Sequence, residues 1–205
     1  YVEELQQGWS QLYPADPVFV VGKHYMEISI RRAYRRKEVF PLRDMVMPMI
    51  EGDPDAHHVA MPPSAPWSPS GEGPGPFLEG GDILIHGQDI LVGEGELCSN
   101  AAGIAWLKRY IERWGYKVHA MPIKGPILHA LGIMCLLREG LLMAHLPSLS
   151  EGLPDPLKDW DVIEITEDEM NAHATVGGSL DDRHYMIDPR FNRLMEEQGQ
   201  RGIEP

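Results

Sequence analysis

The chain has 205 residues, a hydrophobic fraction of 43% and a formal net charge of -13. This length suits a sizeable core, so we expect residues 1–205 to form one domain. The acidic balance excludes a nucleic-acid binder and a binder of anionic membranes, but not a small cationic ligand. No apolar run has the length of a membrane span, and the start lacks the basic stretch of a signal peptide. Two cysteines, Cys98 and Cys135, are too few for a disulfide scaffold, which predicts a cytoplasmic setting.

The first predicted element is a buried strand at 17–22, closed by Gly22. The basic run at 31–37 is predicted to be a helix or a loop with a solvated face. The Pro-, Gly- and Ser-rich segment 52–76 is predicted to be a long loop, which in a compact domain is functional or mobile. It ends just before Glu79.

A unit of strand, turn, strand, helix and strand follows. Its predicted parts are strands at 83–85 and 90–92, a helix from 100 to 114 and a strand at 117–123. Ser99 or Asn100 could cap the helix, and Gly115 ends it. One face of the helix is apolar, with Ile104, Leu107, Ile111 and Trp114 at helical spacing.

This unit recurs twice. The second copy is predicted to have strands at 133–137 and 141–145, a short helix at 157–160 and a strand at 162–165. The third is predicted to have strands at 174–176 and 185–187, a helix with Phe191, Leu194 and Met195 inward that Gly199 ends, and a strand after Gly202. Repetition at a period of roughly forty residues indicates a radial or stacked architecture.

Four residues are candidates for chemistry: Asp16 before the first strand, Glu79 and Asp82 in a Glu-Gly-Gly-Asp turn, and His129 in an apolar run. A carboxylate accepts the paired N–H groups of a guanidinium, and a histidine oriented by an acid transfers protons near neutral pH. Each residue alone has an ordinary alternative. The two aspartates and Glu79 could belong to turns, and His129 could be a core histidine.

At this point the residues resemble a known family. The strings PFLEGGDILIHGQDILVG, SNAAGIAWLKRYIERWGYKVHAMPI and GPILHALGIMCLL look like the amidinotransferase branch of the guanidino-group-modifying superfamily, which includes glycine amidinotransferase, arginine deiminase and dimethylarginine dimethylaminohydrolase. The segment YPADPVFVVG resembles the first-strand motif of glycine amidinotransferase. The resemblance runs from about Pro14 to Met195. It implies an α/β propeller of five ββαβ modules with pseudo-fivefold symmetry, the last module being incomplete in this chain.

In such enzymes a cysteine thiolate attacks the guanidinium carbon, an amine leaves, and water or a second amine resolves the amidino-cysteine intermediate. The resemblance gives Glu79 the role of the acid that orients the catalytic histidine, and His129 that of the histidine itself. It makes Asp16 a carboxylate that grips the guanidinium, and groups Asp82 with it in a supporting role. The implied partner is an arginine-like guanidino substrate. No cofactor, metal, nucleic acid or membrane is expected, and a homo-oligomer is left open.

The sequence departs from the family in three places. The family's nucleophilic cysteine follows a Gly-rich segment near the C-terminus, and these 205 residues contain no such segment. Leu131 stands where some members carry a second guanidinium-binding acid. No arginine lies between 144 and 171, where glycine amidinotransferase has one that holds the substrate carboxylate.

Cys98 is an alternative nucleophile, because a thiolate is favoured at the predicted helix N-terminus, whereas Cys135 is predicted to be core. The sequence therefore predicts an amidinotransferase-like enzyme that lacks its nucleophile and is inactive as these residues alone. The alternatives are a guanidino hydrolase of the same superfamily and a non-catalytic guanidino-binding or scaffold protein.

Overall fold

The computed structural model describes residues 13–64 and 73–205. In these residues a mixed α/β unit occurs four times, and the sequence had predicted at least three copies of it. Each unit has an antiparallel hairpin, and in the first three units a crossover returns a third strand parallel to the second strand. No helix in the described part of the chain is long and apolar enough to cross a membrane.

The first unit comprises β1 (Val18–Val21), β2 (His24–Glu27), α2 (Val39–Glu51) and β3 (His57–Ala60). The prediction of a loop over 52–76 is therefore wrong at β3, which pairs in parallel with β2. Residues 65–72 of that predicted loop lie outside the described part. The basic run forms only a short 3-10 turn, Ala33–Arg35, and the helix follows it. The sequence did not predict α2, because the residues of this helix are apolar on both faces and include two prolines.

The second unit confirms its prediction closely. It comprises β4 (Ile83–His86), β5 (Asp89–Glu94), α3 (Ala101–Ile111) and β6 (Lys117–Pro122). Asn100 is the cap, since its side chain accepts a hydrogen bond from the Gly103 N–H. After Ile111 the helix tightens into a 3-10 turn, which takes Trp114 off the buried face and leaves it 47% exposed. Gly115, at φ 89°, then reverses the chain.

The third unit comprises β7 (Met134–Arg138), β8 (Leu141–Ala144) and β9 (Asp161–Glu164), and a short helix α4 (Glu167–Asn171) follows it. Its predicted helix at 157–160 is wrong. The crossover contains instead a 3-10 turn, Asp155–Leu157, which begins directly after Pro154.

The fourth unit comprises β10 (Gly178–Ser179), β11 (Tyr185–Met186) and α5 (Asn192–Gln200). The strand predicted at 174–176 is wrong, because Thr175 instead bonds through its hydroxyl to the Leu131 carbonyl and the pairing begins at Gly178. The helix includes Gly199 rather than ending there. The strand predicted after Gly202 is reduced to one parallel bridge between Glu204 and His184.

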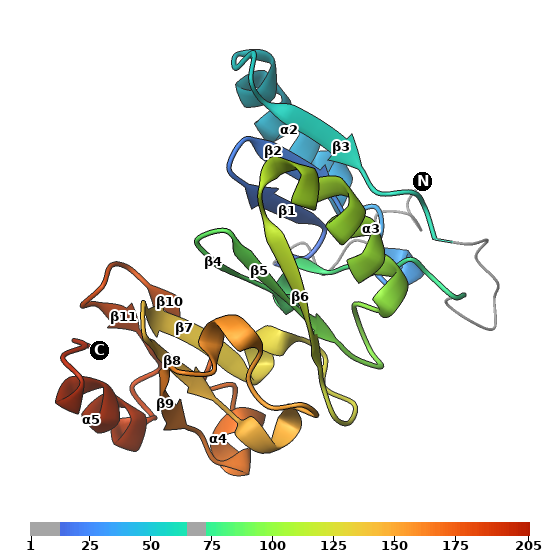
Figure 1. Ribbon diagram of the computed structural model, residues 1–205. Coiled ribbons are helices and arrows are strands. Elements are labelled where there is room, and N and C mark those ends of the chain that lie inside the picture. Colours follow the sequence, from blue (N-terminus) through green and yellow to red (C-terminus); the bar gives the residue numbers. More distant parts are fainter. Residues whose placement is uncertain (1–12, 65–72) are drawn as a thin grey trace.

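The helices α3 and α5 each pack against the sheet of their own unit and also against the sheet of the unit before it. The core around α3 joins Phe19 and Met26 of the first sheet with Ile90 of the second. The core around α5 likewise joins Leu194 with Leu137 of the third sheet. Figure 1 shows the units following one another in an arc, from the blue sheet through green and yellow to the red hairpin. The same rule leaves α2 without a preceding sheet among the described residues.

The turns that lead into the first strands of successive units carry the candidate residues. Asp16 precedes β1, Glu79 and the 3-10 turn Gly80–Asp82 precede β4, and His129 with the 3-10 turn Ala130–Gly132 precedes β7. The repetition of the unit thus explains how residues far apart in the sequence meet at one place.

Candidate active site

An acid–histidine pair lies at the centre of the site. The Nε2 atom of His129 is 2.9 Å from Oε2 of Glu79. The glutamate is 1% exposed, and its second oxygen, Oε1, accepts a hydrogen bond from the Arg31 backbone N–H at 2.9 Å. The backbone N–H of Glu79 donates to the Ser99 hydroxyl. The carboxylate is therefore fixed on both sides and holds the imidazole in one orientation.

The pKa of His129 is raised above its ordinary value. Burial is the largest single effect and acts to lower the pKa, because it disfavours the imidazolium. The hydrogen bond to Glu79, and the negative charges of Asp82, Asp16 and Glu79, together outweigh burial. A histidine in this setting can carry a proton at neutral pH and release it to a neighbouring base.

Asp82 joins three parts of the site and is fully buried. Its Oδ1 accepts from the Cys98 thiol at 3.2 Å and from the Ala130 N–H at 2.9 Å, and its Oδ2 accepts from the Ser99 N–H at 3.0 Å. Burial raises the pKa of Asp82, with the nearby His129 and the hydrogen bonds opposing it. Both oxygens are used within the protein, so Asp82 ties the turn at 79–82 to the turn after His129.

Asp16 and the His129 ring approach the same face of Gly81. A Cβ atom added at Gly81 would be 2.6 Å from Cγ and Nδ1 of His129 and 3.0 Å from Oδ1 of Asp16. Asp16 Oδ1 and the imidazole edge that carries Nδ1 therefore lie on the same side of Gly81, next to the space that its missing side chain leaves open. Asp16 itself is buried. The structure therefore brings together Asp16, Glu79 and His129, and Asp82 bonds the turn that follows His129.

A buried arginine that the sequence did not predict completes the group. Nη1 of Arg35 is 2.9 Å from Oδ2 of Asp16, and Nε and Nη2 of the same guanidinium donate to Glu38. All three side chains are buried. For the run 31–37 the sequence predicted a helix or a loop with a solvated face. The only signal in the sequence was the Arg–x–x–Glu spacing, which puts opposite charges on one side of a helical turn.

The cysteines do not behave as nucleophiles in this structure. Cys98 is fully buried, precedes the helix cap by two residues and donates its thiol hydrogen to Asp82. Burial, followed by the negative charge of Asp82, raises the pKa of this thiol, which opposes the thiolate that the sequence analysis had allowed. Cys135 lies in β7, as predicted for a core residue, and burial raises its pKa to about 12.

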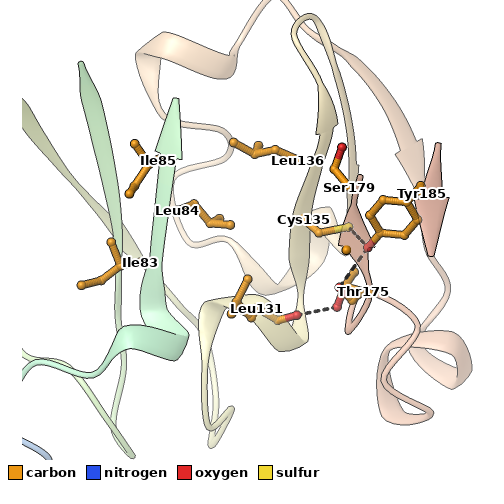
Figure 2. Close-up of a pocket in the computed structure, with 11 residues that line it drawn as sticks. Ile83, Leu84, Ile85, Leu131, Cys135, Leu136, Thr175, Ser179 and Tyr185 are labelled. Carbon is orange, nitrogen blue, oxygen red and sulfur yellow. Dashed lines mark hydrogen bonds between the residues drawn. The ribbon is translucent and has the colours of Figure 1, made fainter. Parts of the chain in front are cut away.

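A cavity of about 260 Å³ lies between β4, β7 and the fourth unit, and none of the four candidate residues is among those that line it. Figure 2 shows Ile83, Leu84 and Ile85 on one side of it, with Cys135, Thr175 and Tyr185 on the other. Leu131, at the position where some relatives carry a second acid, lines this cavity. In the described residues no three His, Cys, Asp or Glu side chains gather as metal ligands.

Comparison with solved structures identifies the fold. The chain superposes on the saxitoxin-pathway amidinotransferase of Microseira wollei with a TM-score of 0.78 and 19% identity, covering 94% of this chain and 62% of that one. It superposes on inosamine-phosphate amidinotransferase of Streptomyces griseus with a TM-score of 0.77 and 20% identity, covering 93% of this chain and 60% of that one. It superposes on the Pseudomonas aeruginosa dimethylarginine dimethylaminohydrolase solved with citrulline with a TM-score of 0.75 and 20% identity. That match covers 97% of this chain and 69% of the hydrolase.

The chain has the fold of the guanidino-group-modifying enzymes. The predicted resemblance is thereby confirmed at the level of the mixed α/β units, and both amidinotransferases and a hydrolase match the chain. The chain spans about three fifths of the length of the two amidinotransferases. Neither a protein-family model nor a curated protein matches the sequence.

Proposed function

We propose that this chain forms the guanidino-binding and proton-transferring part of an amidinotransferase-like enzyme acting on arginine or a related compound. The observation that carries the proposal is the buried Glu79–His129 pair, with an oxygen of Asp16 at the same face of Gly81 as the imidazole. A fold shared with enzymes named for amidino transfer, and with a relative solved with citrulline, supports it. We assign proton transfer to His129, oriented by Glu79. Asp16 would bind the guanidinium of the substrate, and Asp82 would support the site.

The charges of the site favour a cation. Asp16, Glu79 and Asp82 surround His129, and Arg35 is balanced by its own partner Glu38. A guanidinium offers paired N–H donors, and charge-assisted hydrogen bonds to a carboxylate are strong when both groups are withdrawn from water. Asp16 Oδ1 would accept one such donor next to the imidazole.

His129 would manage the protons of the reaction. Because Glu79 binds Nε2, the proton that moves would be the one on Nδ1, which lies at the Gly81 edge. When a thiolate attacks the guanidinium carbon, the C–N bond to the leaving amine breaks and Nδ1–H supplies that amine with a proton. An incoming amine, or water in a hydrolase, then returns a proton to Nδ1 as it displaces the cysteine.

The nucleophile of this scheme lies outside the 205 residues. Both cysteines of the chain are buried with raised pKa values, so neither is assigned the role. These residues alone should bind the substrate without turning it over. We propose that the cysteine comes with a fifth ββαβ module that closes the propeller between the fourth unit and α2.

The packing of helices on sheets supports this closure. In the second, third and fourth units, residues that follow the hairpin pack against the sheet of the preceding unit. In α2, by contrast, Val39 is the single buried residue. The outward side of α2 is largely apolar, with Phe40, Met45 and Met49 exposed. A further sheet would cover this side, as the first sheet covers α3.

Calorimetry with L-arginine tests the binding proposal. The chain should bind L-arginine, and Asp16→Asn should weaken the binding by roughly tenfold or more, the size of one charge-assisted hydrogen bond. Glu27→Gln alters another buried carboxylate, which binds Arg43 and His58 away from the site, and should leave the affinity unchanged. Absence of binding by the unaltered chain would contradict the proposal.

The coding DNA downstream of the Pro205 codon tests the closure. An open frame that encodes another strand–strand–helix–strand unit with a cysteine would support a complete enzyme. Conversion of arginine on that product, with and without an amine acceptor, then separates transferase from hydrolase. A stop codon at that point would instead favour the non-catalytic guanidino-binding protein.

A further inference from the structure

We infer that Arg35 is a positioning residue, which holds one oxygen of Asp16 so that the other faces His129 and the substrate. The inference rests on the proposed function and adds to it a residue in no direct contact with the reacting atoms. It starts from the division of labour between the two Asp16 oxygens. Oδ2 is 2.9 Å from Nη1 of Arg35, and Oδ1 lies on the same side of Gly81 as the His129 ring.

A carboxylate with no fixed partner can rotate about its terminal bond and present either oxygen. The contact with Arg35 removes this freedom, because rotation would break a buried charge-assisted bond. Arg35 can impose the orientation because it is itself immobile. Its Nε and Nη2 donate to the two oxygens of Glu38 at 3.0 and 2.9 Å, so the guanidinium is held in a fork.

The ion cluster also sets the charge that the substrate meets. Arg35 carries one positive charge between two carboxylates, Asp16 and Glu38, so the three side chains together retain one negative charge. Burial acts to lower the pKa of Arg35, but its bonds to Glu38 and Asp16 outweigh burial and raise it. The cluster can therefore accept one cation at Asp16 without giving up its internal pairs.

A lysine could not replace this arrangement. The Arg35 guanidinium uses three nitrogens to bond two carboxylates at once, in a planar geometry that an ammonium lacks. Arg35→Lys keeps the charge and avoids two uncompensated buried carboxylates, so it tests geometry with less risk to folding than a neutral substitution.

The experiment is a double-substitution cycle of Arg35→Lys and Asp16→Asn with two readouts. The first is affinity for L-arginine, in which we expect a loss of roughly tenfold for Arg35→Lys and no further loss in the Asp16→Asn background. The second needs no ligand and is the pKa of His129, read by NMR titration and assigned with His129→Gln. Asp16→Asn should lower it, and Arg35→Lys should lower it only while Asp16 is present.

Arg43→Lys is the matched control. Arg43 forms the same type of two-pronged bond with the buried Glu27, outside the site. It should leave both the affinity and the His129 pKa unchanged, whatever it does to the melting temperature.

The outcomes separate the two proposals. If the unaltered chain binds no L-arginine, the proposed function fails while the His129 titration still tests the role of Arg35. If Arg35→Lys only lowers the melting temperature, with the His129 pKa at its wild-type value and Asp16→Asn shifting it, Arg35 is merely structural and the inference is wrong. If Arg35→Lys acts equally with Asp16 present and absent, it does not act through Asp16, and the inference is wrong as well.

Discussion

The Glu79 carboxylate and the His129 imidazole meet at 2.9 Å, although fifty positions separate them in the sequence. The repeated unit brings them together, since each stands in the turn before the first strand of its own unit. The contact involves Nε2 and leaves Nδ1 at the edge of Gly81 that faces Asp16.

Glu79→Gln should lower the pKa of His129. The substitution preserves the shape of the side chain but removes a charge and a charge-assisted bond, both of which raise that pKa, while burial, which lowers it, remains. An NMR titration of the imidazole measures the shift. Glu27→Gln makes the same change beside another histidine, His58, and should not move the His129 titration. An unchanged His129 pKa in Glu79→Gln would show that the pair is not coupled in solution.

Gly81→Ala should disable the site. The added methyl group would lie 2.6 Å from the His129 ring and 3.0 Å from Asp16 Oδ1, so one of these groups must move. Overpacking of this kind costs about 1–3 kcal/mol of stability, and here it should also abolish measurable L-arginine binding. Gly199→Ala is the control, because its methyl group meets nothing within 4 Å and lies in a helix. It should stabilise the chain by about 0.5–1 kcal/mol and leave binding intact.

Both thiols should be unreactive in the folded chain. Burial raises the pKa of Cys98 and that of Cys135, the latter to about 12, so little thiolate is present at pH 8 and neither sulfur is open to a reagent. A colorimetric thiol assay should detect no cysteine in the native protein and two after unfolding. Rapid labelling that disappears in Cys98→Ala would return Cys98 to consideration as a nucleophile.

His24 should make the chain less stable in mild acid. It is buried, stacks on His57 at 4.8 Å and is bounded by the rings of Tyr110, Trp114 and Tyr116. Burial, and then the neighbouring His57, lowers the folded-state pKa of His24 below 6.5. As the pH falls through about 6.5 the unfolded state therefore takes up this proton first, and stability declines until the folded-state pKa is reached.

Urea unfolding between pH 5 and pH 8 measures this decline. His24→Phe keeps an aromatic ring against His57 but cannot titrate, so its stability should fall less over the acid side of this range. His129 acts in the opposite sense, because its raised folded-state pKa adds stability that is present below 6.5 and lost as the pH rises through that pKa. An identical acid slope in His24→Phe and the wild type would contradict the role of His24.

The sequence was most informative where a local pattern coincided with a packed element. The second unit was predicted nearly to the residue, because Ile104, Leu107 and Ile111 have the period of a helix with one buried face. Failures occurred where tertiary contacts decide the backbone. Many exposed residues of α2 are apolar, as its half-buried ones are, so the helical pattern is blurred in the sequence. Thr175 lies in a sequence typical of a strand but bonds the Leu131 carbonyl instead.

The candidate site shows the same division. Asp16, Glu79, Asp82 and His129 were found through a family resemblance, since spacing alone could not show that their turns converge. Arg35 could not be found in that way. A basic run is usually solvated, and only the fold reveals that one arginine of the run points inward at Asp16.

The exposed side of α2 has a thermodynamic consequence for the site. Glu38 is the residue at which this helix begins, and it is also the partner that immobilises Arg35. A protein surface that packs on Phe40 and Met45 would therefore restrain the start of the helix. Through Glu38 and Arg35 it would also restrain the Asp16 carboxylate. Binding at the two places is then linked, and by reciprocity a guanidino ligand at Asp16 would strengthen the hold of that surface on α2 by the same factor.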